Sequence, residues 1–367
     1  MNKDIVINYV CEVEYPNTSA YAIHVLKMCD AFASQNNKIN LISPHISLNI
    51  NKLKVNYNIK NKINFFSILK TRRTNFLKRI FFSLKILNNK SLNKGICIYI
   101  SRSVIFAIIG SIFNKKVILE LHHELSGLTK ILYFFLKKRQ LLKNLRYIFI
   151  HKNLIRAFKP TKKKYICLDD AVDVHDFKND KFSKKIEKTC VYVGSFHRGK
   201  GVELILQIAK TLQHVNFHLY GDRNFLNSEK KLKNVTIFNY INYKKIPKIL
   251  SKYEIALMPY GNWVSGRLKK INLRNSMSPL KMFDYLASGN IIIASDLDVY
   301  KHILKNNYNS ILLNNSQTNL WCHWIDKIFT STKKYTYIKK NSLKTAKKYT
   351  WLIRSKKILN FAHQEFF

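Results

Sequence analysis

Two short stretches of the sequence combine the residue types that bind anions. In residues 189–201, TCVYVGSFHRGKG, an apolar strand runs into a glycine-containing loop that carries Arg198 and Lys200. In residues 275–289, NSMSPLKMFDYLASG, the Ser-Pro pair at 278–279 predicts the start of a helix that ends near the glycine. Cationic side chains and the free N–H groups of a helix start both hold phosphate. The two stretches therefore predict a site for a diphosphate.

A carboxylate follows one turn into the second stretch. Asp284 is placed to accept hydrogen bonds from vicinal hydroxyls of the kind that ribose offers. Taken alone, each piece also fits an ordinary capped helix with a surface acid, and the loop is neither a P-loop nor a GxGxxG turn. The presence of two anion-suited helix starts in one domain is the stronger indication.

The elements around these stretches predict an α/β fold. Short β-branched runs alternate with longer amphipathic runs, as in parallel sheets covered by helices, and 367 residues suffice for two domains. Helices are expected at residues 19–34, 202–212 and 279–288. Strands are expected in two series, at residues 4–10, 39–42, 96–100, 117–121, 147–150 and 165–168, and then at 189–194, 217–220, 235–238, 255–258, 291–294 and 311–313.

The polar stretch at residues 169–188 separates the two series and has the composition of a linker. We therefore expect an N-terminal domain over residues 1–173 and a C-terminal domain over residues 174–348. Residues 349–367 predict one further amphipathic helix, with Trp351 among its apolar positions.

The sequence resembles a known family in both halves. In the second half, VYVGSFHRGKGVELILQIAK, FHLYGD and SPLKMFDYLASGNIIIASD look like the donor domain of the retaining family 4 glycosyltransferases, or glycosyl transferases group 1. In the first half, YPNTSAYAIHVLKMCDAFASQNNKINLIS, VILELHHE and CLDDAVDVHDF are similar to further parts of that family. The resemblance covers most of residues 4–315. It implies the GT-B fold, in which two Rossmann-like domains face each other across a cleft and the final helix crosses back to the first domain.

The resemblance also implies roles for residues of the second domain, which would bind the nucleotide sugar. Lys200 would neutralise the donor diphosphate, and Arg198 would assist from the same loop. Asp284 stands where the family has its ribose-binding acid. The donor phosphates would also be bound at the loop residue Ser195 and at the helix start formed by Ser278, Pro279 and Leu280.

In the first domain, which would bind the acceptor, the resemblance assigns a contact with the donor sugar to His122, in preference to its neighbour His123. The loop of Thr18, Ser19 and Ala20 would face the acceptor and the donor phosphates.

The sequence departs from the family pattern at three places. Ser276 stands where the family has the first acid of its paired motif. Ser195 stands where it often has an arginine, so that Arg198 is the candidate replacement. Ser19 and Ala20 replace the usual glycine pair, which limits how closely a ligand approaches that backbone.

The implied reaction moves a sugar from a nucleotide-diphosphate donor to a glycan or lipid-linked acceptor in the synthesis of bacterial cell-surface polysaccharide, lipopolysaccharide or glycolipid. Retention of anomeric configuration is expected, with the leaving phosphate helping to deprotonate the acceptor. No metal or other cofactor is expected. An alternative comes from Asp296 and Asp298, a DxD pair such as metal-dependent GT-A glycosyltransferases use, although it directly follows the apolar run IIIAS.

The formal net charge of +43 indicates a polyanionic partner, although an AT-rich genome would also enrich lysine. No acidic residue occurs between Asp30 and Glu120. Within this span, residues 71–90 predict a helix with an apolar arc and basic residues that include Arg72 and Arg73. Such a helix suits either an anionic membrane surface or a core-facing position. A nucleic-acid-binding protein without catalysis is a second alternative, but no recognition motif is present and no specific nucleic-acid partner is expected.

The remaining features concern location. Six scattered cysteines without a CxxC pair indicate neither a disulfide framework nor a zinc site. The apolar run at residues 5–10 is too short for a signal peptide, and residues 96–113 fit a strand and a short helix better than a membrane span. We therefore expect a cytoplasmic protein that is peripheral on the inner face of the cell membrane.

Overall fold

The computed structural model describes residues 5–47, 49–69, 75–177, 184–221, 232–266 and 271–367. The chain divides into two compact units, Met1–Asp169 with Trp351–Phe367 (unit 1) and Asp170–Thr350 (unit 2). Arg72 and Arg73 of the predicted basic helix lie outside the described residues.

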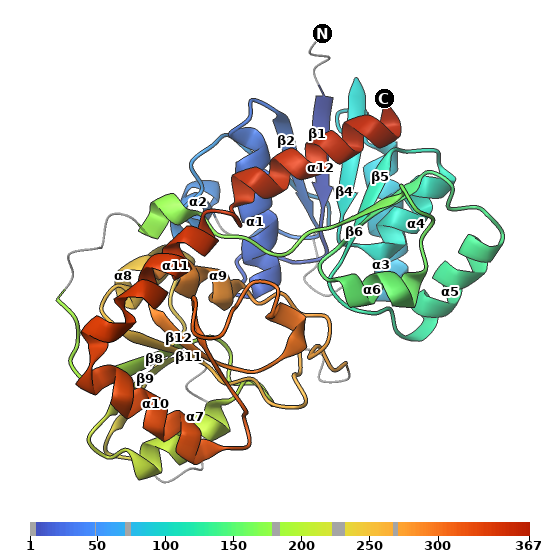
Figure 1. The fold of residues 1–367 in the computed structure, drawn as a ribbon. Coiled ribbons are helices and arrows are strands. Elements are labelled where there is room, and N and C mark those ends of the chain that lie inside the picture. The colour runs from blue at the N-terminus through green and yellow to red at the C-terminus, as the bar shows by residue number, and fades with distance from the viewer. Residues whose placement is uncertain (1–4, 48, 70–74, 178–183, 222–231, 267–270) are drawn as a thin grey trace. The chain divides into compact units, whose positions relative to one another are not determined.

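Unit 1 contains a parallel sheet of seven strands in the order β3-β2-β1-β4-β5-β6-β7 (Figure 1). Side chains of the strand interiors are buried because helices cover the sheet. The strands are β1 (Ile5–Val10), β2 (Lys38–Ser43), β3 (Asn64–Ser67), β4 (Ile96–Ser101), β5 (Val117–Leu121), β6 (Leu145–Phe149) and β7 (Tyr165–Cys167). The helices are α1 (Ala20–Ala33), α2 (Ile50–Tyr57), α3 (Phe76–Asn88), α4 (Val104–Ile112), α5 (Gly127–Lys138), α6 (Lys152–Phe158) and the C-terminal α12 (Trp351–Phe366).

Helix α12 belongs to unit 1 although it is the last element of the chain. It packs along α1, as the red and blue helices of Figure 1 show. Gln35 donates a hydrogen bond to Ser355 over 2.6 Å, which ties the end of α1 to α12. The chain therefore returns to its first unit after completing the second.

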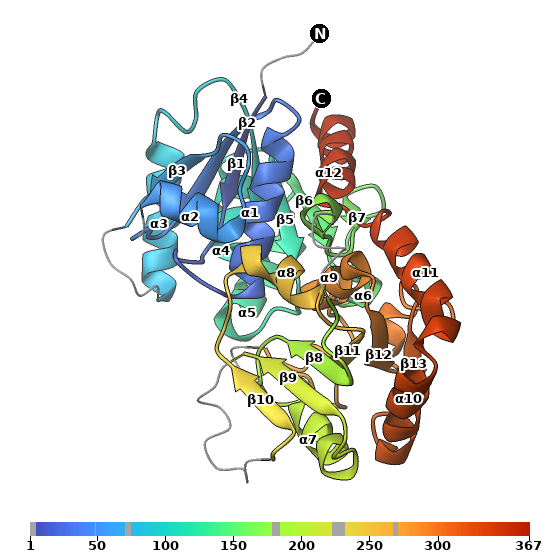
Figure 2. The same ribbon diagram turned by 90° about the vertical axis from the view of Figure 1, so that its left-hand side faces the viewer.

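Unit 2 contains a parallel sheet of six strands in the order β10-β9-β8-β11-β12-β13 (Figure 2). The strands are β8 (Thr189–Val193), β9 (Asn216–Tyr220), β10 (Val235–Phe238), β11 (Ile255–Met258), β12 (Ile291–Ser295) and β13 (Ile311–Leu313). The helices are α7 (Val202–Thr211), α8 (Ile246–Leu250), α9 (Leu280–Ser288), α10 (Thr318–Thr330) and α11 (Thr336–Ala346), with 3₁₀ turns at Val174–Phe177, Tyr243–Lys245, Asp298–Tyr300 and Thr332–Tyr335.

Each sheet has a point where its strand order reverses, at β1 and β4 in unit 1 and at β8 and β11 in unit 2. In open parallel sheets, ligands bind at the carboxyl ends of the strands beside such a point. The loops after β1 and β8 are therefore the places where this architecture puts its chemistry.

Helix α3 corrects one expectation about orientation. The apolar arc of residues 71–90 was compatible with a core-facing position, but the side chains that α3 buries are Phe82, Ser83 and Ile86. Leu77 and Phe81, which belong to the arc, are exposed. None of the described helices combines the length and apolarity that crossing a membrane requires.

Candidate active site

The loop after β8 is shaped by two glycines on either side of Lys200. Gly199 has φ +76°, and a Cβ there would lie 1.5 Å from the carbonyl oxygen of Trp263. Gly201 has φ +89° and precedes the first turn of α7, and its Cβ would lie 1.8 Å from the Pro259 oxygen. Any side chain at either position would collide with backbone, so both glycines are required to hold Lys200 in place.

Lys200 is half-buried and has no acidic partner among the described residues. Burial lowers the pKa of its ammonium to about 8. Its Nζ lies 5.2 Å from the ring centroid of Tyr260, at cation–π distance. A buried cation without a counter-ion is costly, so the environment favours an anion beside it.

A second lysine, which the sequence interpretation did not single out, lies beside the first. Lys281 Nζ is 3.6 Å from the Tyr192 ring centroid and 5.6 Å from that of Tyr260. In the described part of the chain this Nζ has no hydrogen-bond partner. Burial, and then the charge of Lys200, hold the pKa of Lys281 well below its usual range. The two ammonium groups thus form one cationic cluster beside the Tyr260 ring.

The glycine at the end of β8 makes room for this cluster. A Cβ at Gly194 would lie 2.5 Å from Lys281 Nζ. Lys281 occupies the first turn of α9, where the helix dipole disfavours a cation. That unfavourable position is the sequence signal that could have identified it.

The start of α9 differs from its prediction. The helix begins at Leu280, with Pro279 at the N-cap position and no side-chain cap. Ser278 does not cap it, since its Oγ accepts a hydrogen bond from the Asp170 N–H over 3.0 Å. Ser276, at the position of the missing acid, is also nearly buried. The helix does end at Gly289, as predicted, with φ +66°.

Asp284 lies inside α9 and is 5% exposed. Its Oδ1 accepts a hydrogen bond from Tyr243 Oη over 3.1 Å. Burial, and then the Asp284 charge, raise the pKa of Tyr243 well above its usual range, so Tyr243 stays a donor. The carboxylate is therefore held by a protein hydroxyl in this structure, and its role toward ribose stays a prediction.

The other loop residues differ in exposure. Ser195 is half-buried, and its carbonyl accepts a hydrogen bond from Tyr192 Oη over 2.8 Å. The Arg198 side chain is exposed, whereas its carbonyl accepts two hydrogen bonds from Ser265. The structure thus brings Lys200 and Lys281 together and leaves the guanidinium of Arg198 at the surface.

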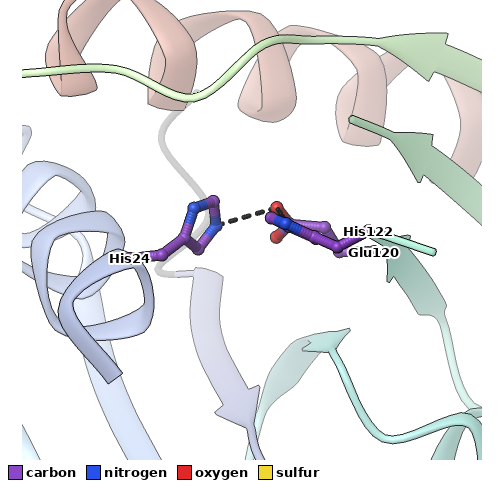
Figure 3. Close-up of side chains that lie close together, drawn as sticks. All are labelled: His24, Glu120 and His122. Atoms are coloured by element: carbon purple, nitrogen blue, oxygen red, sulfur yellow. Dashed lines mark hydrogen bonds and ion pairs between the residues drawn. The ribbon is translucent and has the colours of Figure 1, made fainter. Parts of the chain in front are cut away.

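In unit 1, three side chains converge at the carboxyl end of β5 (Figure 3). His24, from α1, and His122 each place Nε2 2.8 Å from Glu120 Oε1. Arg354, from α12, donates to the same oxygen over 2.9 Å, and Tyr9 donates to Oε2 over 2.7 Å. The carboxylate is therefore surrounded by partners from β1, α1, α12 and the loop after β5.

These contacts determine the protonation states of the cluster. Burial opposes ionisation of Glu120, but Arg354 and His24 together with the histidine hydrogen bonds hold its pKa well below its usual range. Burial, and then the charge of Arg102, lower the pKa of His122 to about 3, although Glu120 raises it. A neutral His122 that donates from Nε2 to an ionised carboxylate keeps its lone pair on Nδ1. His122 thus presents a hydrogen-bond acceptor, while His123 is exposed.

Two histidines and a carboxylate are also a possible set of metal ligands, and the ligand atoms of His24, Glu120 and His122 lie within 4.8 Å of one another. The Arg354 guanidinium on the same Glu120 oxygen opposes a cation there. The donor set therefore fits a hydrogen-bonded network better than a metal centre.

The loop after β1 provides the start of α1. Ser19 caps this helix, since its Oγ accepts a hydrogen bond from the Ala22 N–H over 3.3 Å. Asn17 accepts from the Ser19 N–H over 2.9 Å and thereby orders the loop. Thr18 and Ala20 are exposed.

The DxD pair carries a lysine. Lys301 Nζ lies 2.9 Å from Asp296 and 3.0 Å from Asp298, and the Asp298 side chain is almost fully exposed. The pair lies beyond β12, on the surface of unit 2, and holds its own counter-ion.

The model of one protein family, glycosyl transferases group 1, matches residues 173–345. These residues belong to the glycosyl transferases group 1. No curated protein sequence matches the chain.

Solved structures are similar over nearly the whole chain. A glycosyltransferase from Rickettsia africae matches with a TM-score of 0.76 at 13% identity, over 100% of this chain and 99% of that one. HepE from Anabaena, in complex with UDP and glucose, matches with a TM-score of 0.68 at 10% identity, over 98% and 99%. WaaG, a glycosyltransferase involved in lipopolysaccharide biosynthesis, matches with a TM-score of 0.63 at 11% identity, over 97% and 99%.

The predicted GT-B fold, with two Rossmann-like parallel-sheet domains, is therefore confirmed, and the chain is a glycosyltransferase. The GT-B fold contradicts the GT-A fold of the DxD alternative, and a glycosyltransferase contradicts the alternative of a protein without catalysis. The group 1 match includes the loop of Lys200 and the helix of Lys281 and Asp284.

Proposed function

We propose that this chain is a retaining glycosyltransferase that moves a sugar from a nucleotide-diphosphate donor to a glycan or lipid-linked acceptor in the synthesis of bacterial cell-surface polysaccharide, lipopolysaccharide or glycolipid. Unit 2 binds the donor and unit 1 binds the acceptor. The observation that carries this function is the pair of half-buried lysines, Lys200 and Lys281, which have no acidic partner among the described residues and whose pKa values burial lowers.

The difficult step in the reaction is the departure of the nucleoside diphosphate. As the bond between the anomeric carbon and the phosphate oxygen breaks, negative charge develops on that oxygen. Two ammonium groups in a water-poor site stabilise this charge without reorganising. Because these lysines supply positive charge, we propose that the reaction needs no metal ion or other cofactor.

Retention follows when the acceptor enters on the face that the phosphate leaves. The acceptor oxygen forms the new bond to the anomeric carbon, and its proton passes to a leaving-phosphate oxygen. His122 takes no proton in this scheme, because its pKa of about 3 keeps it neutral. It instead accepts a hydrogen bond at Nδ1 from a sugar hydroxyl.

The donor base and the pathway are proposals of the same kind. HepE has been solved with UDP and glucose, which makes UDP the first nucleotide to test. The link of WaaG to lipopolysaccharide biosynthesis supports an envelope glycan or its lipid-linked precursor as the acceptor. Such an acceptor places the enzyme in the cytoplasm, on the inner face of the membrane, where an anionic surface attracts a basic protein.

Nucleotide binding tests the proposed function. Calorimetry with UDP, GDP, ADP and CMP at moderate salt compares the wild type with Lys200→Ala, Lys281→Met and Asp284→Ala. Lys210→Ala, at an exposed lysine of α7, is the matched control. We expect one nucleotide to bind selectively without added metal, and the three site variants but not the control to lose it. Equal weak binding of all four, unchanged by the variants, would show that only net charge was measured.

A further inference from the structure

Two helices of unit 1 leave large apolar side chains uncovered. On α3, Leu77, Phe81 and Leu84 recur at helical spacing, and Leu77 is 72% exposed. On α5, Leu128 and Ile131 are 69% and 67% exposed, and one turn further along Phe135 is 55% exposed. We call these six side chains the α3/α5 face.

The opposite sides of the same helices are already buried. Phe82 and Ile86 of α3 and Tyr133 of α5 belong to the hydrophobic core of unit 1. Each helix is therefore apolar on two sides, of which only one packs into the hydrophobic core. A globular helix that packs against one sheet needs only one apolar stripe.

The two helices share a layer. Helix α4 contacts both α3 and α5. The right-handed crossovers β3-α3-β4, β4-α4-β5 and β5-α5-β6 place all three helices on one side of the sheet. Figure 2 shows α3, α4 and α5 in succession along unit 1. At the end of this layer, Ile112 and the following Phe113 are exposed as well.

The charge around the face has one sign. No Asp or Glu occurs in α3, α4 or α5, and only Glu120 and Glu124 occur between residues 31 and 168. Lys85 Nζ lies 4.6 Å from the Phe81 ring centroid, and Arg139 Cζ lies 5.5 Å from that of Phe135. Cationic groups thus stand directly beside the exposed apolar rings.

We propose that the α3/α5 face docks on an anionic lipid bilayer. Leu, Ile and Phe side chains enter the interface, while neighbouring lysines and arginines reach the lipid phosphates. A second copy of this chain fits less well, because its own face would bring the same positive charges together. Nucleic acid offers no apolar surface for Leu77, Leu128 and Ile131.

Lipid docking rests on the proposed function only in explaining how the enzyme reaches a lipid-linked acceptor. Lipid binding itself needs neither donor nor catalysis. It is therefore measured on the ligand-free chain, and nucleotide binding is measured separately on the same samples.

The test is co-sedimentation with vesicles of phosphatidylcholine, with and without phosphatidylglycerol. The α3/α5 variant carries four changes, Leu77→Ser, Phe81→Ser, Leu128→Ser and Ile131→Ser. The matched control carries four changes at other exposed positions, Val55→Ser, Tyr308→Ser, Tyr337→Ser and Leu352→Ser. Far-UV circular dichroism and retained nucleotide binding establish that each variant is folded.

We expect the wild type and the control to bind the anionic vesicles. The α3/α5 variant should bind at least about 100-fold more weakly, since four partly inserted side chains are lost. Salt should weaken the binding of the wild type, because lipid phosphates contribute to it. Equal binding by the α3/α5 variant and the wild type would overturn lipid docking and reveal adsorption by net charge.

The oligomeric state provides an independent check. If the wild type were a dimer in the absence of lipid and the α3/α5 variant a monomer, the face would be assigned to a second copy of the chain and docking on lipid would be overturned. A monomer that binds vesicles but no nucleotide would leave lipid docking standing and contradict the proposed function instead.

Discussion

The two units carry polar clusters of opposite character. In unit 1, both oxygens of Glu120 are engaged, by His24, His122, Arg354 and Tyr9. In unit 2, the neighbouring lysines have no acid against them among the described residues. Because buried charge is costly when unpaired, the first cluster is complete in the free protein, whereas the second becomes complete when an anion arrives. The two clusters therefore differ in whether their charges are already paired in the free protein.

Breaking the complete cluster should have the largest effect on stability. In Arg354→Met, Glu120 loses its fixed positive partner and stays buried, so the free energy of unfolding should fall by about 3–5 kcal/mol. Denaturant titration measures this change. The exposed Arg156, changed to Met, is the control and should leave stability unaltered.

A double variant sharpens this measurement. Glu120→Gln alone leaves Arg354 unpaired, whereas Glu120→Gln with Arg354→Met removes both charges. The double variant should therefore be less destabilised than the sum of the two single changes. Simple additivity would mean that the two residues do not act as a pair.

Removing a lysine from the cluster in unit 2 should instead increase the stability of the ligand-free protein. Lys281→Met removes an amine whose charged form is destabilised by burial and by Lys200, and whose Nζ has no hydrogen-bond partner in the described part of the chain. The ligand-free variant should therefore melt at a higher temperature than the wild type. Its transfer rate should fall roughly 100- to 1000-fold, the loss expected when one group that stabilises transition-state charge is removed. Thermal melts and donor kinetics on one preparation measure both. A variant that melts lower and transfers sugar normally would show that Lys281 serves only the fold.

The pattern of apolar runs predicted most of the fold. Strands β10, β11 and β13 have the predicted bounds, because a short apolar run between polar segments fixes where a strand begins and ends. Strand β3 was not predicted, since its four residues, NFFS, are only partly buried and show no clear alternation. The apolar pattern that predicts a strand was thus clearest for buried strands and weakest for β3, which lies at the edge of its sheet.

The candidate site was less predictable, for a reason that Ser278 illustrates. Its sequence context predicted a helix cap, yet its hydroxyl pairs with Asp170, 108 residues away. The partners of Glu120 likewise come from residues 9, 24, 122 and 354, which no local pattern connects. Local preferences predict elements, whereas tertiary partners decide what each polar group does.

The lysine cluster of unit 2 also predicts how stability responds to pH. Burial lowers the pKa of Lys200 to about 8 in the folded protein, whereas an unfolded lysine keeps its ordinary pKa of 10.5, so the unfolded chain holds more protons between these two values. Stability of the ligand-free protein should therefore rise between pH 8 and 10.5. Nucleotide affinity should fall over the same interval, by at most about tenfold per pH unit, as Lys200 loses its charge.

Lys200→Met is the control for both slopes. The difference in unfolding free energy between the wild type and the variant, measured as a function of pH, isolates the contribution of Lys200 from that of the other lysines. Parallel curves for the two proteins would show that Lys200 keeps an ordinary pKa and carries no buried charge.

The smallest effect should come from the surface carboxylates beyond β12. Lys301 bridges Asp296 and Asp298, but the side chains involved are largely exposed, and pairs of this kind add little to stability. Asp296→Asn with Asp298→Asn should therefore change neither the melting temperature nor the rate of transfer, with or without added manganese. If manganese increased the transfer rate of the wild type but not of the double variant, the result would place a metal at this pair. It would also contradict the proposal that the two lysines of unit 2 supply the positive charge that stabilises the leaving diphosphate.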